Sequence, residues 1–112
     1  MNKAILLGYV GKDPEIRYIS TRPVATFTLA TTEPARKTAD GNEIPERTEW
    51  HNIVMWDRNA EIAERYIRKG TRLMCEGKLR TRVWEDKSAI KRYTTEIVVD
   101  NFELLKEIYP GR

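Results

Sequence analysis

The sequence predicts a small all-β domain of five strands, with one α-helix between the third and the fourth strand. Its 112 residues can bury one modest core and are too few for two. Five runs are rich in β-branched and aliphatic residues and are separated by glycine, proline and polar clusters. The expected strands are residues 4–10, 24–32, 48–56, 71–84 and 92–104.

One segment has the period of a helix rather than that of a strand. Residues 57–70 carry apolar side chains at spacings of three and four, as on one face of an amphipathic helix. Asp57 is expected as the N-cap of this helix and Gly70 as its end. The order of three strands, one helix and two strands is typical of a five-stranded OB-fold barrel.

The composition favours a cytoplasmic protein without a bound metal. The chain has 20 Lys and Arg against 17 Asp and Glu, so local basic clusters matter more than its net charge of +3. The single cysteine, Cys75, is expected to be structural, and with one histidine it cannot form a zinc site. The apolar N-terminal run is too short for a signal peptide or a membrane span. We expect no metal, no cofactor and no membrane association.

Two tryptophans share one face of the third predicted strand. The period of two places Trp50, Asn52, Val54 and Trp56 on the same side of this strand. Either tryptophan taken alone is more usual in the core of a small domain. The alternative is an exposed platform on which nucleic-acid bases stack, at roughly 1 to 3 kcal/mol per base.

The fourth predicted strand favours the exposed platform. The same parity puts Lys78, Arg80, Arg82 and Trp84 on one face, provided that no bulge shifts the register. Burial of three cations without partners is costly, so this face is expected in water or against a polyanion. A solvated, salt-bridged face is the alternative. Since arginine pairs with phosphate and stacks on bases, the pattern predicts binding to unpaired DNA or RNA.

An enzyme is not expected. Catalysis needs a nucleophile with its base, a set of metal ligands or convergent carboxylates. Glu85 and Asp86 adjoin a turn and have no identifiable partners for a nuclease-like metal site. His51 faces away from Trp50 and is expected to be a packed or interfacial residue. A small metal-dependent nuclease is therefore the weaker hypothesis.

Six segments carry a resemblance to a known family: MNKAILLGYVGKDPEIRY, VATFTLAT, RTEWHNIVMW, AEIAERYIRKG, EGKLRTRVWED and RYTTEIVV. In this order and spacing they resemble the bacterial single-stranded DNA-binding protein family, from Met1 to about Val99. The resemblance implies an OB barrel, a homotetramer and sequence-tolerant binding of single-stranded DNA in replication, recombination and repair. It also implies association with the nucleoid.

The resemblance implies roles for single residues as well. Trp50, Trp56 and Trp84 look like base-stacking residues, and His51 is similar to the subunit-interface histidine of the family. The positions that resemble contacts to the DNA backbone are Lys3, Lys69, Arg80 and Arg82.

Two features depart from the family pattern. Many members have a further stacking tryptophan in the first long arm, where this chain has Arg36, whose guanidinium is expected to stack or to pair with phosphate. Members also continue into a tail with an acidic end that recruits replication and repair proteins, whereas this chain ends at Arg112, so that recruitment is not carried over. We expect residues 1–105 to form the DNA-binding domain and residues 106–112 a short C-terminal remnant. The alternative function is an RNA-binding or primosome-associated OB-fold module.

Overall fold

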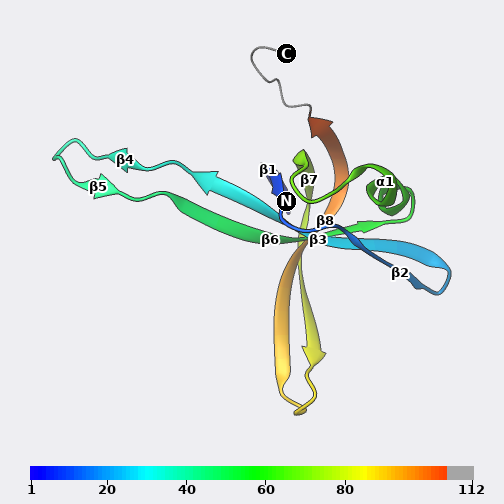
Figure 1. The fold of residues 1–112 in the computed structure, drawn as a ribbon. Coiled ribbons are helices and arrows are strands. Elements are labelled where there is room, and N and C mark those ends of the chain that lie inside the picture. Colours follow the sequence, from blue (N-terminus) through cyan, green and yellow to red (C-terminus); the bar gives the residue numbers. More distant parts are fainter. Residues whose placement is uncertain (106–112) are drawn as a thin grey trace.

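Five strands close into a barrel in the computed structural model, which describes residues 1–105 (Figure 1). They follow the order β1-β7-β8-β6-β3, and β3 pairs again with β1 to close the barrel. β6 and β8 run parallel, whereas the other neighbours run antiparallel. The predicted five-stranded barrel is therefore confirmed. Its strands are β1 (Ala4–Val10), β3 (Arg22–Glu33), β6 (Arg47–Trp56), β7 (Arg72–Glu85) and β8 (Lys91–Leu105).

Closure of the barrel depends on a glycine in β1. Tyr9 and Val10 pair with Ala30 and Leu29 of β3, while the same strand also pairs with β7 along its length. The backbone at Gly8 passes so close to Ala30 that a Cβ at this position would overlap with the Ala30 carbonyl oxygen. β1 can therefore bridge β7 and β3 because residue 8 has no side chain.

The inward faces of the barrel strands form a continuous apolar core. Alternation along β6 buries Ile53 and Met55 completely, and β7 adds Leu73 and Cys75. Burial raises the pKa of the Cys75 thiol to about 11. The thiol is therefore protonated at neutral pH, as expected for a structural cysteine.

The helix α1 (Arg58–Tyr66) follows β6, as predicted, and packs against β3 and β6. Its predicted end near Gly70 is wrong, because the helix stops at Tyr66. Ile67 fits the apolar spacing and is fully buried, but its backbone is already extended. Gly70 instead has a positive φ in the turn that leads to β7. In the part of the chain that the structure describes, no helix is long and apolar enough to cross a membrane.

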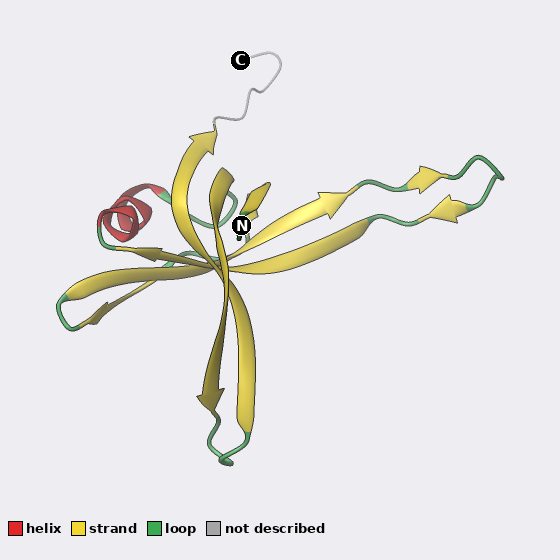
Figure 2. Ribbon diagram, turned by 180° about the vertical axis from the view of Figure 1, so that it is seen from behind, coloured by secondary structure: helices red, strands yellow, loops and turns green. Residues whose placement is uncertain are grey.

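Several strand pairs extend beyond the barrel as two-stranded arms (Figure 2). β2 (Glu15–Ile19) folds onto the start of β3, although the sequence pattern assigns no strand there. β3 and β6 continue outward toward a hairpin of β4 (Arg36–Lys37) and β5 (Glu43–Ile44). β7 and β8 continue past the barrel into a second long arm. The arms give the molecule extents of 54 × 43 × 30 Å.

Candidate nucleic-acid interface

The outer surface of the barrel carries a hollow of about 430 Å³ lined by residues of β2, β3, β6, β7 and β8. We call it the basic hollow. Within residues 1–105 no group of His, Cys, Asp and Glu could hold a metal ion. A cavity that combines several cations with an indole suits an anionic, aromatic ligand such as a nucleic acid. The cations and the indole in its lining are Lys12, Arg17, Arg80, Arg82 and Trp56.

Strand pairing explains why side chains from distant segments meet in the basic hollow. Asn52 of β6 pairs with Glu96 of β8, and Glu96 pairs with Arg80 of β7. Paired residues point to the same side of a sheet, so one row of side chains crosses from β6 to the β7–β8 arm. The predicted basic face of β7 is therefore continuous with the predicted tryptophan face of β6.

A bulge lies close to this row but leaves the parity of β7 intact. Glu76 pairs with Asn101 and Gly77 pairs with Val99, so the extra residue is Asp100 of β8. Since the bulge is in the partner strand, Lys78, Arg80, Arg82 and Trp84 keep the common face that the sequence predicts.

The tryptophans lie along this face and none belongs to the core. Trp56 lines the basic hollow and is partly exposed. Trp50 is 61% exposed and lies two residues before Asn52, which also lines the hollow. Trp84 is 41% exposed and follows Arg82 along the arm. The core alternative is therefore wrong, and the indoles are available on the surface.

A hydrogen bond holds the polar edge of the Trp84 indole. Its Nε1–H donates to the hydroxyl of Thr94 on β8 at 2.9 Å. Thr94 pairs with Arg82 across the arm and lines the basic hollow. The hydrogen bond thus fixes the ring beside the cationic side chains, with part of its surface still exposed.

The Trp50 indole lies against the backbone of Gly11, where a side chain would leave it no room. A Cβ at residue 11 would overlap with Cζ3 of Trp50 and lie 2.8 Å from the hydroxyl of Thr28. We expect Gly11→Ala to displace the exposed indole while the protein stays folded. The emission spectrum and acrylamide quenching of Trp50, recorded with Trp56 and Trp84 changed to phenylalanine, test this. Identical values with glycine and alanine at residue 11 would contradict the expected contact.

Arg82 is held by an internal carboxylate. Its Nε donates to Oε1 of Glu96 at 3.2 Å and its Nη2 donates to Oε2 at 3.1 Å. The Glu96 side chain is only 13% exposed, so it stays close to the sheet surface. Arg80 has no carboxylate within ion-pair distance in residues 1–105. Arg80 can therefore meet a phosphate directly, whereas Arg82 would have to share or exchange its partner.

The other predicted contact residues lie outside the lining of the basic hollow. Lys3 precedes β1 and its Nζ lies 3.4 Å from Oε1 of Glu76. Lys69 lies in the turn between α1 and β7, and Arg36 lies in β4 on the long arm. The structure thus brings together Trp56, Arg80 and Arg82 but not these three cations.

His51 lies on the strand face opposite to the tryptophans, as predicted. It is half-buried, and its Nε2 lies 2.8 Å from the hydroxyl of Thr31 in the neighbouring strand β3. This bond holds the imidazole against β3, on the strand face opposite to the tryptophans.

Two cations of the basic hollow are not among the predicted binding residues. Lys12 lies in the turn after β1, and Arg17 lies in β2, which the sequence pattern did not assign. The register of β2 with β3, in which Arg17 pairs with Val24, brings Arg17 to this face. The sequence signal that could have predicted β2 was the alternation of polar and apolar side chains within residues 15–19.

Residues 1–105 match the model of the Single-strand binding protein family. The chain belongs to this family. The predicted family is therefore confirmed.

Similar members of the single-strand binding protein family support the fold as well. A single-stranded DNA-binding protein of Bacteroides thetaiotaomicron is 55% identical over 106 residues. That match covers 94% of this chain but 66% of the relative, slightly less than two thirds of its length. The Plasmodium falciparum SSB complex with ssDNA has a TM-score of 0.84 and 35% identity, covering 95% of this chain and 96% of that one. The predicted OB fold is thereby confirmed.

Proposed function

We propose that this chain binds and protects single-stranded DNA with little sequence preference and without chemistry. The observation that carries the proposal is the basic hollow, which joins Trp56 to Arg80 and Arg82 on one exposed face. Bases stack on Trp56, and on Trp50 and Trp84 at either side, while phosphates pair with the arginines. Stacking accepts any base, because every base has a π-face.

Several features support single strands over a duplex. Bases reach the indole faces only when they are unpaired. The cations and tryptophans follow strands β6 and β7 rather than a helix that could enter a major groove. Outer cations, including Lys3, Lys69 and Arg36, extend the path of the DNA backbone beyond the basic hollow.

Tryptophan fluorescence during titration tests the proposal. We expect strong quenching by oligo(dT), a weak response to duplex DNA, and an affinity that falls with salt as counterions are released. Oligo(rU) of equal length separates DNA binding from the RNA-binding alternative. Absence of quenching and of binding at low salt would overturn the proposal.

Salt dependence separates the roles of Arg80 and Arg82. Each phosphate contact to a single strand contributes about 0.7 to the slope of log K against log[salt]. We expect Arg80→Ala to lower the magnitude of this slope by about 0.7. Arg82→Ala should lower it less, because Glu96 already compensates the Arg82 charge. Equal slopes for wild type and Arg80→Ala would contradict a phosphate contact at Arg80.

We propose a homotetramer in which the outward face of β1 and His51 lie at subunit interfaces. This face carries Ile5, Leu7 and Tyr9, which are 63%, 47% and 47% exposed. A row of exposed apolar side chains on one strand marks a site of protein association. Light scattering should give four times the chain mass of 13.1 kDa, and a smaller mass for Leu7→Asp. A monomer mass for the wild type would overturn the tetramer.

We also propose where the protein acts. Binding of unpaired DNA regardless of sequence suits replication, recombination and repair, in which such strands are exposed, and implies a cytoplasmic, nucleoid-associated protein. Residues 1–105 would form the DNA-binding domain, whereas the predicted C-terminal remnant, residues 106–112, lies outside the described residues.

A further inference from the structure

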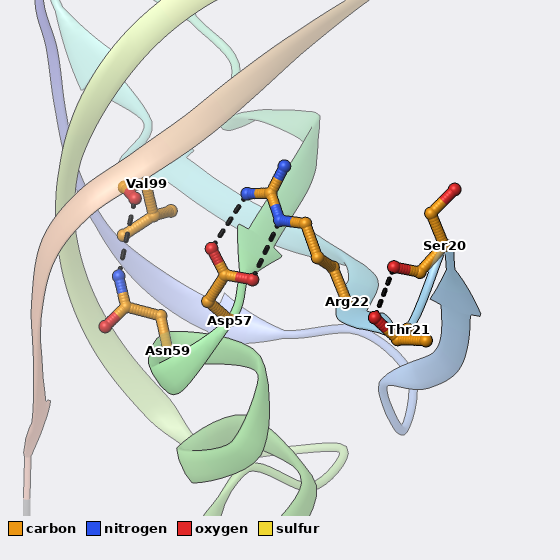
Figure 3. A network of polar contacts seen from close by, with 6 residues as sticks. All are labelled: Ser20, Thr21, Arg22, Asp57, Asn59 and Val99. Carbon is orange, nitrogen blue, oxygen red and sulfur yellow. Dashed lines mark hydrogen bonds and ion pairs between the residues drawn. The ribbon is translucent and has the colours of Figure 1, made fainter.

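An ion pair joins the β2–β3 hairpin to the start of α1 (Figure 3). Nε of Arg22 donates to Oδ1 of Asp57 at 3.0 Å, and Nη2 donates to Oδ2 at 2.8 Å. This two-point geometry orients the guanidinium more strictly than a single contact would. The pair lies next to Trp56, which directly precedes Asp57 in the chain.

The guanidinium of Arg22 covers the Trp56 indole. Its Cζ lies 4.7 Å from the centroid of the ring, within the range of a cation–π contact. Trp56 lines the basic hollow, but Arg22 is not part of that lining. The indole is thus covered by Arg22 on one side and still contributes surface to the hollow.

The side chain of Asp57 makes this contact and not a helix cap, whereas its backbone carbonyl accepts the first helical hydrogen bond from the N–H of Glu61 at 3.0 Å. Asp57 occupies the N-cap position of α1, yet its side chain makes no capping hydrogen bond. Its φ of 56° is unfavourable for a residue with a side chain, and its N–H donates to the carbonyl of Pro23 at 2.9 Å. The carboxylate is directed to Arg22 instead of the first helical turn.

The carboxylate of Asp57 compensates the charge of Arg22. The hydrogen bonds that Arg22 donates hold the pKa of Asp57 below its usual range, and the same contact with the carboxylate raises the pKa of Arg22. Both groups are therefore ionised at neutral pH. A guanidinium already paired in this way has little charge left to offer a phosphate, but its flat face can still support a ring.

We propose that Arg22, held by Asp57, is a positioning residue that braces Trp56 and makes it a one-sided platform, on which a single base stacks from the basic hollow. The inference rests on the proposed function, because it assigns how one indole of that surface is held. Arg22 acts through Trp56 and not through the DNA backbone.

A double-mutant cycle between Arg22 and Trp56 tests the brace in the full chain. Arg22→Ala should lower the affinity for oligo(dT) about two- to fivefold, the range of an exposed cation–π contact. The slope of log K against log[salt] should not change. In a Trp56→Ala background, Arg22→Ala should have no further effect. Arg17→Ala is the matched control from the same hairpin and should weaken binding and lower the slope in both backgrounds.

Two results would overturn the brace. One is an equal loss from Arg22→Ala with and without Trp56, and the other is a slope lowered by about 0.7, as for a direct phosphate contact. Either result leaves the proposed function standing, because the wild type still binds. Failure of the wild type to bind oligo(dT) would reject the proposed function itself.

A second measurement reports on the indole directly. With Trp50 and Trp84 changed to phenylalanine, Trp56 is the only tryptophan, and Arg22→Ala should raise its acrylamide quenching constant. Asp57→Asn keeps the size of the side chain but removes its charge. It should change quenching and affinity in the same direction as Arg22→Ala does. A gain in affinity for Asp57→Asn would mean that Asp57 competes with DNA for Arg22, which contradicts the brace.

Discussion

Replacement of Trp50, Trp56 and Trp84 together by alanine is expected to lower the affinity for oligo(dT) by more than about 100-fold. Each stacked base contributes roughly 1 to 3 kcal/mol, so three platforms contribute at least about 3 kcal/mol. Trp50 and Trp84 are exposed and Trp56 is partly exposed, so the barrel should stay folded. Anisotropy of a labelled oligonucleotide measures the affinity without depending on protein fluorescence.

The matched control keeps aromatic rings at all three positions. Phenylalanine at residues 50, 56 and 84 preserves a π-face for stacking and should retain most of the affinity. Circular dichroism and thermal unfolding establish that the alanine variant is folded. An unchanged affinity in a stably folded triple-alanine protein would reject stacking as the basis of binding.

Gly8→Ala is expected to open the barrel between β1 and β3. The new methyl group would overlap with the backbone carbonyl of Ala30, which cannot rotate away as a side chain can. Overpacking of this kind typically costs about 1–3 kcal/mol. We expect the midpoint of thermal unfolding to fall by about 10 °C, with loss of oligo(dT) binding in the opened form.

The control for Gly8→Ala is a glycine with free space around it. Gly41 lies in the turn between β4 and β5 with a φ of 87°, and a Cβ added there would meet no atom within 4 Å. Gly41→Asn should leave the unfolding midpoint nearly unchanged, because asparagine tolerates positive φ better than most residues. A Gly8→Ala protein as stable as Gly41→Asn would mean that β1 and β3 separate easily.

Periodicity predicted the barrel strands and the shared face of the tryptophans and arginines. It succeeded because alternation sets the side to which each residue points, and the bulge at Asp100 did not disturb β7. It failed at the end of α1, because Ile67 has the apolar spacing of the helix but is buried with an extended backbone. β2 was missed because Glu15–Ile19 is short and mostly exposed.

Contacts between distant segments could not be predicted from one sequence. The pairs Arg82–Glu96 and Arg22–Asp57 depend on strand register, which periodicity within a strand does not determine. The same is true of Arg17, which reaches the basic hollow only through the pairing of β2 with β3. Sequence thus identified the chemistry of the surface, whereas pairing determined which charges are already compensated.

The β7–β8 arm has a further consequence for how the chain can be altered. All residues of β7 beyond Gly77 are exposed, and the turn at its tip is closed by Asp86, whose carboxylate accepts N–H bonds from Ser88 and Ile90. Among residues 1–105, the buried core includes no residue of that turn. Extra residues or a reporter peptide can therefore be inserted at the tip without disturbing the apolar interior, because exposed loop tips tolerate insertions best.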